Sequence, residues 1–107
     1  MSVEALAKVF LTPANLVLFD VSWAPGAKER KAAWVARFSA ERTLVRSVDC
    51  FRSREEAEKA EVSKYPTVAL VSEDGRVTRC LSTQDSPKLL RWSAEALDDL
   101  KRYTRRD

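Results

Sequence analysis

Short, fully apolar runs alternate along the chain with segments in which apolar residues recur every three or four positions. Residues 16–19 are apolar throughout, which is typical of a strand buried on both faces. Residues 43–48, 67–71 and 76–81 have the same strand-like character. The helical spacing covers residues 25–40, where Ala27, Trp34, Val35 and Phe38 share one side with Lys31 at the rim. The pattern predicts alternating helices and strands.

Residues that favour helix ends mark the boundaries of the helical segments. Ser2 can cap a first helix, which ends at Pro13. Pro25 suits the first turn of the next helix. Ser53 with Glu56 forms a capping box that opens a helix over residues 53–63. The element order predicted from these signals is α-β-α-β-α-β-β-α.

The connections between the predicted strands define the sheet. Strands joined through a helix pair in parallel by a right-handed crossover. Asp74 and Gly75 lie between the last two strands, and Asp-Gly is a strong signal for an antiparallel hairpin. We therefore expect an α/β fold with a mixed sheet of four to five strands and helices on both faces. The sequence leaves open whether the last helix begins at Pro87 or after Ser93.

Size and composition fit a single domain over residues 1–107. The chain contains no histidine, which excludes imidazole metal ligands and the usual Ser/His and Cys/His nucleophiles. Two cysteines alone cannot make a zinc site, so we expect no metal and no cofactor. The acidic start of the sequence and its short apolar runs lead us to expect neither a signal peptide nor a membrane-spanning segment. A cytoplasmic or otherwise reducing compartment is the expected location.

The formal net charge of +3 is too small to favour nucleic acid as a partner. Aromatic residues do not interleave with the basic ones, as they commonly do in nucleic-acid-binding surfaces. A basic surface that binds nucleic acid or an anionic surface ranks last among our hypotheses. Its residues would be Lys28, Arg42, Arg46 and the tail residues Lys101, Arg102, Arg105 and Arg106.

An ordered set of short motifs resembles the thioredoxin family, which includes protein disulfide isomerase domains. The segment Trp23-Ala24-Pro25-Gly26-Ala27-Lys28 follows the first strand where that family has Trp-Cys-Gly-Pro-Cys-Lys, and Trp23 and Lys28 match it. Tyr65-Pro66-Thr67 matches the family's cis-proline segment, and Asp49 and Gly75 match an acid and a hairpin glycine. The resemblance covers nearly the whole chain and implies the thioredoxin fold.

The departures from the family pattern affect its chemistry. Ala24 and Ala27 occupy the positions of the two redox cysteines, and Leu18 that of a buried acid that moves protons. Ala32 stands where thioredoxins usually kink the helix with proline. Thiol–disulfide exchange needs a thiolate, which alanine cannot supply. We therefore expect no dithiol oxidoreductase activity.

The resemblance implies that a groove for an extended peptide remains. A redox-inactive module that binds a peptide or protein, as an adaptor, assembly factor or chaperone-like domain, is the leading hypothesis. The alternative role for Trp23 and Tyr65 is that their side chains only pack on each other. The helix start at Gly26 and Ala27 could bind an anion, or water could satisfy its N–H groups. The expected partner-binding residues are Trp23, Pro25, Gly26, Tyr65, Pro66 and Thr67.

The two cysteines offer one alternative function. The resemblance implies that the strand before Cys50 lies next to the strand of residues 16–21, so Cys50 should lie near the Trp23–Lys28 segment, and Arg52 and Arg54 could lower its pKa. A monothiol or glutathione-linked activity through Cys50 is therefore the second hypothesis. Cys80 lies three strands away, at roughly 14 Å, too far for a disulfide with Cys50. The simpler expectation is that both are reduced, partly buried thiols.

Overall fold

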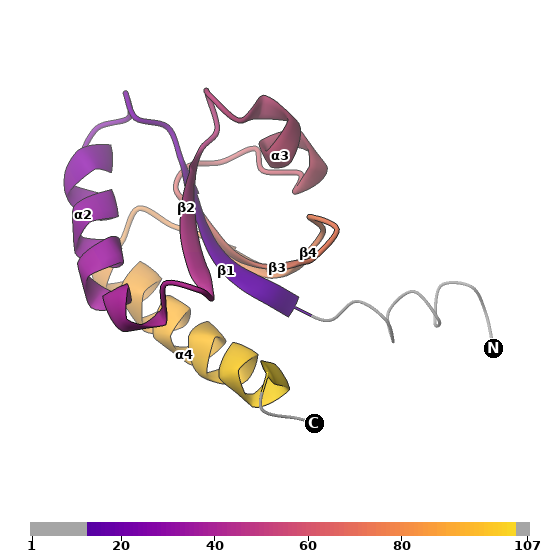
Figure 1. Ribbon diagram of the computed structural model, residues 1–107. Helices are drawn as coiled ribbons and strands as arrows, with labels where there is room; N and C mark the ends of the chain where they lie inside the picture. The colour runs from indigo at the N-terminus through magenta and orange to yellow at the C-terminus, as the bar shows by residue number, and fades with distance from the viewer. Residues whose placement is uncertain (1–12, 105–107) are drawn as a thin grey trace.

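The computed structural model describes residues 13–104 as one sheet with helices on both of its faces (Figure 1). The predicted first helix and the tail residues Arg105 and Arg106 lie outside the described residues. The described elements are β1 (Pro13–Asp20), α2 (Ala27–Arg37), the 3₁₀ turn η1 (Ser39–Glu41), β2 (Val45–Asp49), α3 (Arg54–Lys59), β3 (Thr67–Ser72), β4 (Val77–Ser82) and α4 (Ser86–Thr104).

The four strands form a mixed sheet in the order β2-β1-β3-β4. β1 and β2 are parallel, as their helical connection predicts, and Phe19 lies opposite Val48. β3 runs antiparallel to β1, with Phe19 opposite Thr67, and β4 is antiparallel to β3 through the predicted hairpin. The predicted fold class, a mixed α/β sheet, is therefore confirmed.

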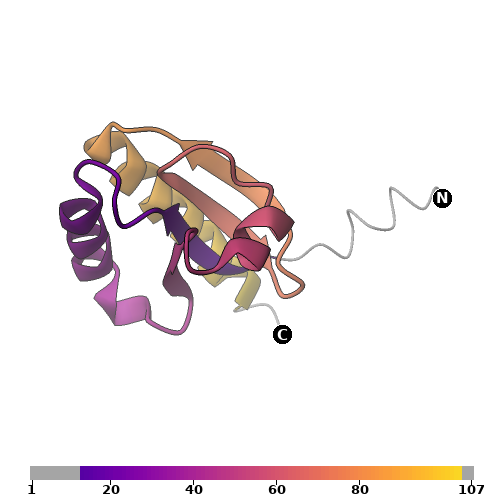
Figure 2. The same ribbon diagram turned by 90° about the horizontal axis from the view of Figure 1, so that it is seen from above.

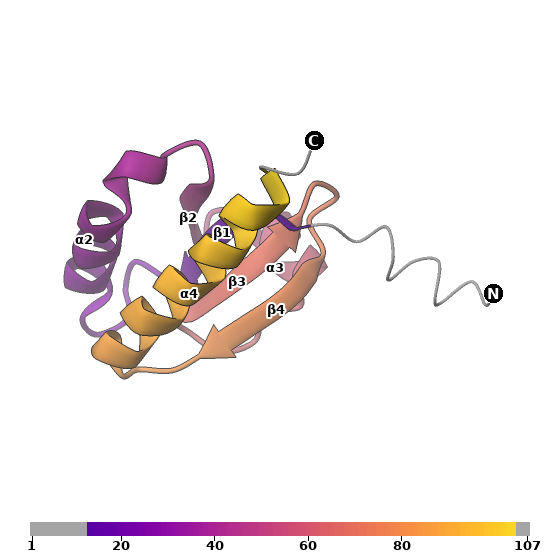
Figure 3. The same cartoon turned by 90° about the horizontal axis from the view of Figure 1, so that it is seen from below.

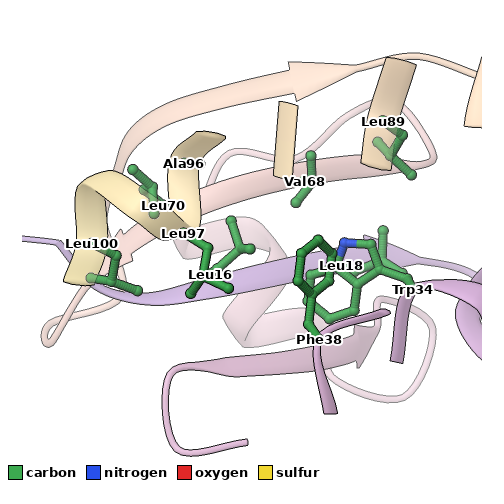
Figure 4. Packing of buried hydrophobic residues seen from close by; sticks show 10 residues of the cluster. All are labelled: Leu16, Leu18, Trp34, Phe38, Val68, Leu70, Leu89, Ala96, Leu97 and Leu100. Carbon is green, nitrogen blue, oxygen red and sulfur yellow. The ribbon is translucent and has the colours of Figure 1, made fainter. Parts of the chain in front are cut away.

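Each face of the sheet carries its own apolar cluster, because the strand residues alternate between the two faces. On one face, α2 and α4 cover Leu16 and Leu18 of β1 (Figures 3 and 4). The short helix α3 lies on the other face (Figure 2), where its Ala57 belongs to the same apolar cluster as Val17 and Phe19 of β1. All four β1 residues are at most 1% exposed. The run at residues 16–19 is therefore a strand buried on both faces, as its sequence predicts.

Trp34 anchors the packing of α2 against α4. Its indole Nε1 donates a hydrogen bond to Ser93 Oγ at 3.0 Å, and that hydroxyl donates to the Leu89 carbonyl at 2.7 Å. The Trp34 ring meets Phe38 edge-on at a centroid distance of 5.4 Å (Figure 4). The core assignment of Trp34 is confirmed. Val35, expected on the same apolar stripe, is instead 45% exposed.

Several element boundaries differ from the sequence predictions for local reasons. Pro13 begins β1 instead of ending a helix. Ser53 precedes α3, but its side chain makes no capping hydrogen bond. α3 ends at Lys59, four residues early, and Glu61 then adopts a left-handed backbone with φ of 58°. α4 begins at Ser86, which settles the open choice in favour of the Pro87 start.

Among residues 13–104, no helix combines the length and the apolar character that crossing a membrane requires.

Candidate functional site

The segment Trp23–Lys28, which we call the motif loop, connects the end of β1 to the start of α2. Its turn is closed by backbone hydrogen bonds from Ala24 N–H to the Val21 carbonyl (3.1 Å) and from Ala27 N–H to the Ala24 carbonyl (3.0 Å). Gly26 precedes the helix with φ of 74°, a left-handed conformation that glycine adopts without strain. The Ala27 N–H, expected to be free for an anion, is therefore already bonded within the loop.

The motif loop and the Tyr65–Pro66 segment lie at the same end of the sheet. The motif loop follows β1, Tyr65 and Pro66 precede β3, and these strands are neighbours with Phe19 opposite Thr67. The Tyr65–Pro66 peptide bond is cis. Trp23 and Tyr65 line the same hollow, so the fold brings together the two segments that the resemblance pairs.

The two alanines of the motif have only methyl side chains at the positions where the family carries thiols. Ala27 is buried at the first position of α2, and Ala24 packs partly buried against the α3-side cluster. Leu18, in place of the family's acid, is 1% exposed and belongs to the core below α2. The interior side of the motif is therefore apolar.

A buried ion pair supports the motif loop, and sequence reasoning did not find it. Arg30 of α2 places Nε and Nη2 each 2.8 Å from Oδ2 of Asp20 at the end of β1. Oδ1 of Asp20 accepts the Val21 N–H at 2.9 Å, and Arg30 Nη1 donates to the Pro25 carbonyl at 3.3 Å. Arg30 thus joins the strand end, the loop and the helix.

Beside the loop, aromatic side chains border a hollow of about 300 Å³ between the motif and α3. We call this the aromatic hollow and define it by Trp23, Phe51 and Tyr65, with Cys50 also in its lining. Trp23 is 71% exposed and Phe51 is 59% exposed. Trp23 is therefore not buried by packing on Tyr65. The Arg54 guanidinium lies 5.8 Å from the Phe51 ring centroid.

The structure assigns different roles to the remaining expected partner-binding residues. Pro25 and Gly26 are exposed, as binding requires. Pro66 is fully buried and Thr67 is 4% exposed, which leaves their side chains little surface for a partner, and their part in binding stays a prediction. The Thr67 hydroxyl donates to the Lys64 carbonyl at 2.7 Å and lies 2.5 Å from Ser82 Oγ. The hydroxyl contacts of Thr67 thus fix the start of β3 against Lys64 and Ser82.

Cys50 lines the aromatic hollow, but as a buried thiol of low acidity. It is 4% exposed, and burial raises its pKa to about 11, with the nearby carboxylates Asp49, Asp20 and Glu56 adding to the increase. A hydrogen bond from the Tyr65 hydroxyl acts in the opposite direction without reversing it. The expectation that neighbouring arginines lower this pKa is therefore wrong.

Cys80 differs from Cys50 in exposure and position. Both cysteines are free, so the predicted absence of a disulfide between them is confirmed. Their strands β2 and β4 lie at opposite edges of the sheet. Cys80 is exposed on β4, which corrects the expectation of a partly buried thiol.

The expected basic surface is partly neutralised by acidic partners. Arg46 pairs with Glu56, and Lys101 Nζ lies 2.7 Å from Glu41 Oε1. Within residues 13–104, no group of three or more cysteine, aspartate or glutamate side chains is placed to hold a metal ion.

The comparisons with known proteins show what kind of fold this is. No family model matches the chain, and no curated protein matches it in sequence. Thioredoxin of Plasmodium falciparum superposes with a TM-score of 0.62 at 17% identity, covering 86% of this chain and 91% of that one. The germline-specific thioredoxin Deadhead of Drosophila melanogaster gives 0.59 at 18% identity, with 86% and 88% covered.

Mitochondrial thioredoxin 3 of Saccharomyces cerevisiae gives a TM-score of 0.60 at 16% identity, with 86% of this chain and 88% of that chain covered. At such identities the similarity concerns architecture and not activity. The element order, the sheet order and these superpositions agree. The chain has the thioredoxin fold.

Proposed function

We propose that this protein is a redox-inactive module that binds a peptide or protein partner at the aromatic hollow. The observation that carries the proposal is the exposure of Trp23 and Phe51, 71% and 59%, which both line one hollow. Large aromatic side chains bury much area on association at a small cost in conformational entropy. Val35 is the remaining large apolar side chain that is exposed in the part of the chain described.

The chemistry around the hollow supports binding without thiol exchange. Ala24 and Ala27 supply no nucleophile, and the thiol of Cys50 is protonated at neutral pH because its pKa is about 11. The position of Cys50 in the lining of the hollow fits the monothiol alternative, but its raised pKa argues against it. What remains at the site is apolar area with hydrogen-bonding groups at its border.

The lining of the hollow suggests the kind of partner. Val62 and Ala57 add apolar surface, while Arg54 and Glu58 supply one charge of each sign at the border. Such a site suits an apolar or aromatic side chain of an extended segment, flanked by polar residues. Tyr65 and Pro66 directly precede β3, and we propose that an extended peptide lies along the backbone of Tyr65.

The test is a peptide-library selection on the immobilised protein, followed by titration of selected peptides. Trp23→Ala and Phe51→Ala should each weaken binding at least tenfold, because each removes a large exposed contact surface. Val35→Ala is the matched control, since it removes an exposed apolar side chain from α2 and should leave the affinity unchanged. Peptides whose affinity is indifferent to Trp23 and Phe51 would contradict the proposal.

A further inference from the structure

A second hollow, of about 280 Å³, lies between the start of α2 and the ends of β1 and β2. We call it the α2 pocket. Its apolar lining comes from Leu18, Val21, Ala27 and Val48, and it shares only Val21 with the aromatic hollow. Because Leu18 and Ala27 stand where the resemblance would place an acid and a cysteine, these two positions contribute neither charge nor nucleophile to the pocket.

The two carboxylates that line the pocket are already engaged. Asp20 is held by Arg30 and the Val21 N–H. Asp49 accepts hydrogen bonds from the Phe51 N–H at 3.0 Å and from the Ser22 hydroxyl. Desolvation is the largest single influence and raises the pKa of Asp49, but the hydrogen bonds and the Arg52 charge together outweigh it and lower the pKa. Asp20 is therefore ion-paired with Arg30, whereas Asp49 accepts hydrogen bonds from two neutral donors and lies near the Arg52 charge.

Two lysines, Lys28 and Lys31, also line the pocket, and they form no ion pair among residues 13–104. Lys28 and Lys31 lie three residues apart on α2, so their side chains are neighbours on one helix face. Both are exposed. The border of the pocket thus carries two lysine ammonium groups outside any ion pair of the described residues, against one carboxylate, Asp49, that is not ion-paired there either.

From this arrangement we propose that the α2 pocket binds a small carboxylate with a short apolar tail. The tail would lie against Leu18, Val48 and Ala27, and the carboxylate would be held between the ammonium groups of Lys28 and Lys31. A mostly apolar lining with a few convergent polar groups is the usual composition of small-molecule sites, and the volume is at their lower end. The proposal does not depend on peptide binding at the aromatic hollow.

The probe is hexanoate, titrated into the ¹⁵N-labelled protein while backbone amide shifts are followed. We expect saturable shifts at Ala27, Lys28, Ser47 and Val48, which line the pocket. 1-Hexanol and hexylamine carry the same tail without the negative charge, so they should bind at least tenfold more weakly. The absence of saturable shifts at the pocket amides with hexanoate would overturn the proposal.

The charge requirement is tested by the double variant Lys28→Gln/Lys31→Gln. It should weaken hexanoate binding by about tenfold, since two exposed charge contacts are lost. The matched control Lys64→Gln/Lys88→Gln removes the same net charge from exposed lysines elsewhere and should leave the affinity unchanged. Equal affinity in the two double variants, or equal binding of hexanol and hexanoate, would overturn the proposal, because the tail alone would then account for binding.

Discussion

The Asp20–Arg30 pair joins the motif loop to both β1 and α2, so removing the arginine should destabilise the whole fold. Both side chains are only 11% exposed, and Arg30 makes two contacts of 2.8 Å with one carboxylate oxygen. The substitution Arg30→Met keeps much of the aliphatic volume but removes the charge. The Asp20 carboxylate would then keep only the Val21 N–H as a donor in a largely dry environment.

The magnitude follows from burial. Removing one partner of a buried pair costs about 3–5 kcal/mol, because the remaining charge is left uncompensated. Some solvent reaches this pair, so we expect about 3 kcal/mol for Arg30→Met. Asp20→Asn should cost about 1–2 kcal/mol, since the longer Arg30 side chain can still reach water and the Pro25 carbonyl. The double variant should lose about 2 kcal/mol, so the two losses are not additive.

The assay is urea denaturation of the four proteins in the double-mutant cycle, followed by far-UV circular dichroism at neutral pH. Arg79→Met is the matched control, because the Arg79–Asp99 pair is exposed, 50% and 35%, and should be worth less than about 1 kcal/mol. An Arg30→Met loss no larger than that of the control would refute the reasoning. So would simple additivity of Arg30→Met and Asp20→Asn.

Three further predictions concern buried or titrating groups. Ser93→Ala leaves the indole N–H of Trp34 without an acceptor and should cost about 1–3 kcal/mol in urea denaturation; a loss below about 0.5 kcal/mol would contradict it. Iodoacetamide at pH 8 should label Cys80 well before Cys50, since a pKa of about 11 leaves about one thiolate in a thousand; peptide mapping showing the reverse order would refute this. Because the pKa of Asp49 is lowered in the folded protein, its carboxylate stabilises the fold above the ordinary pKa of 3.8, and this stabilisation is lost as the pH falls through the folded pKa. Asp49→Asn should therefore remove part of the acid dependence of the free energy of unfolding. An NMR titration midpoint of Asp49 above 3.8 would contradict the lowered pKa.

Most of the fold could be predicted because its strands are short, apolar and separated by strong turn signals. Residues 16–19 identify β1 by being apolar throughout, and Asp74-Gly75 identifies the hairpin. Helix ends were less predictable. α3 ends four residues before the predicted position, and the chain then turns at Glu61 in a left-handed conformation. The apolar pattern could not predict this end, because the turn depends on the local backbone.

The candidate site was only partly predictable, because its key contacts join residues far apart in the sequence. Trp23 and Tyr65 were identified through the motif resemblance and do share a hollow. Phe51 was missed, since a lone aromatic residue in a loop carries no pattern; its place directly after Cys50 was the available signal. The Asp20–Arg30 contact spans ten residues and exists only once α2 packs beside the end of β1. Pro66 and Thr67 match the motif but face inward, which no sequence pattern indicates.

The most direct test of the account is a disulfide-reduction assay with insulin and dithiothreitol at neutral pH. The account predicts that the protein adds nothing to the rate with dithiothreitol alone, because Ala24 and Ala27 supply no thiol and Cys50 is protonated. An acceleration that disappears in a Cys50→Ser variant would contradict it and would establish the monothiol activity instead.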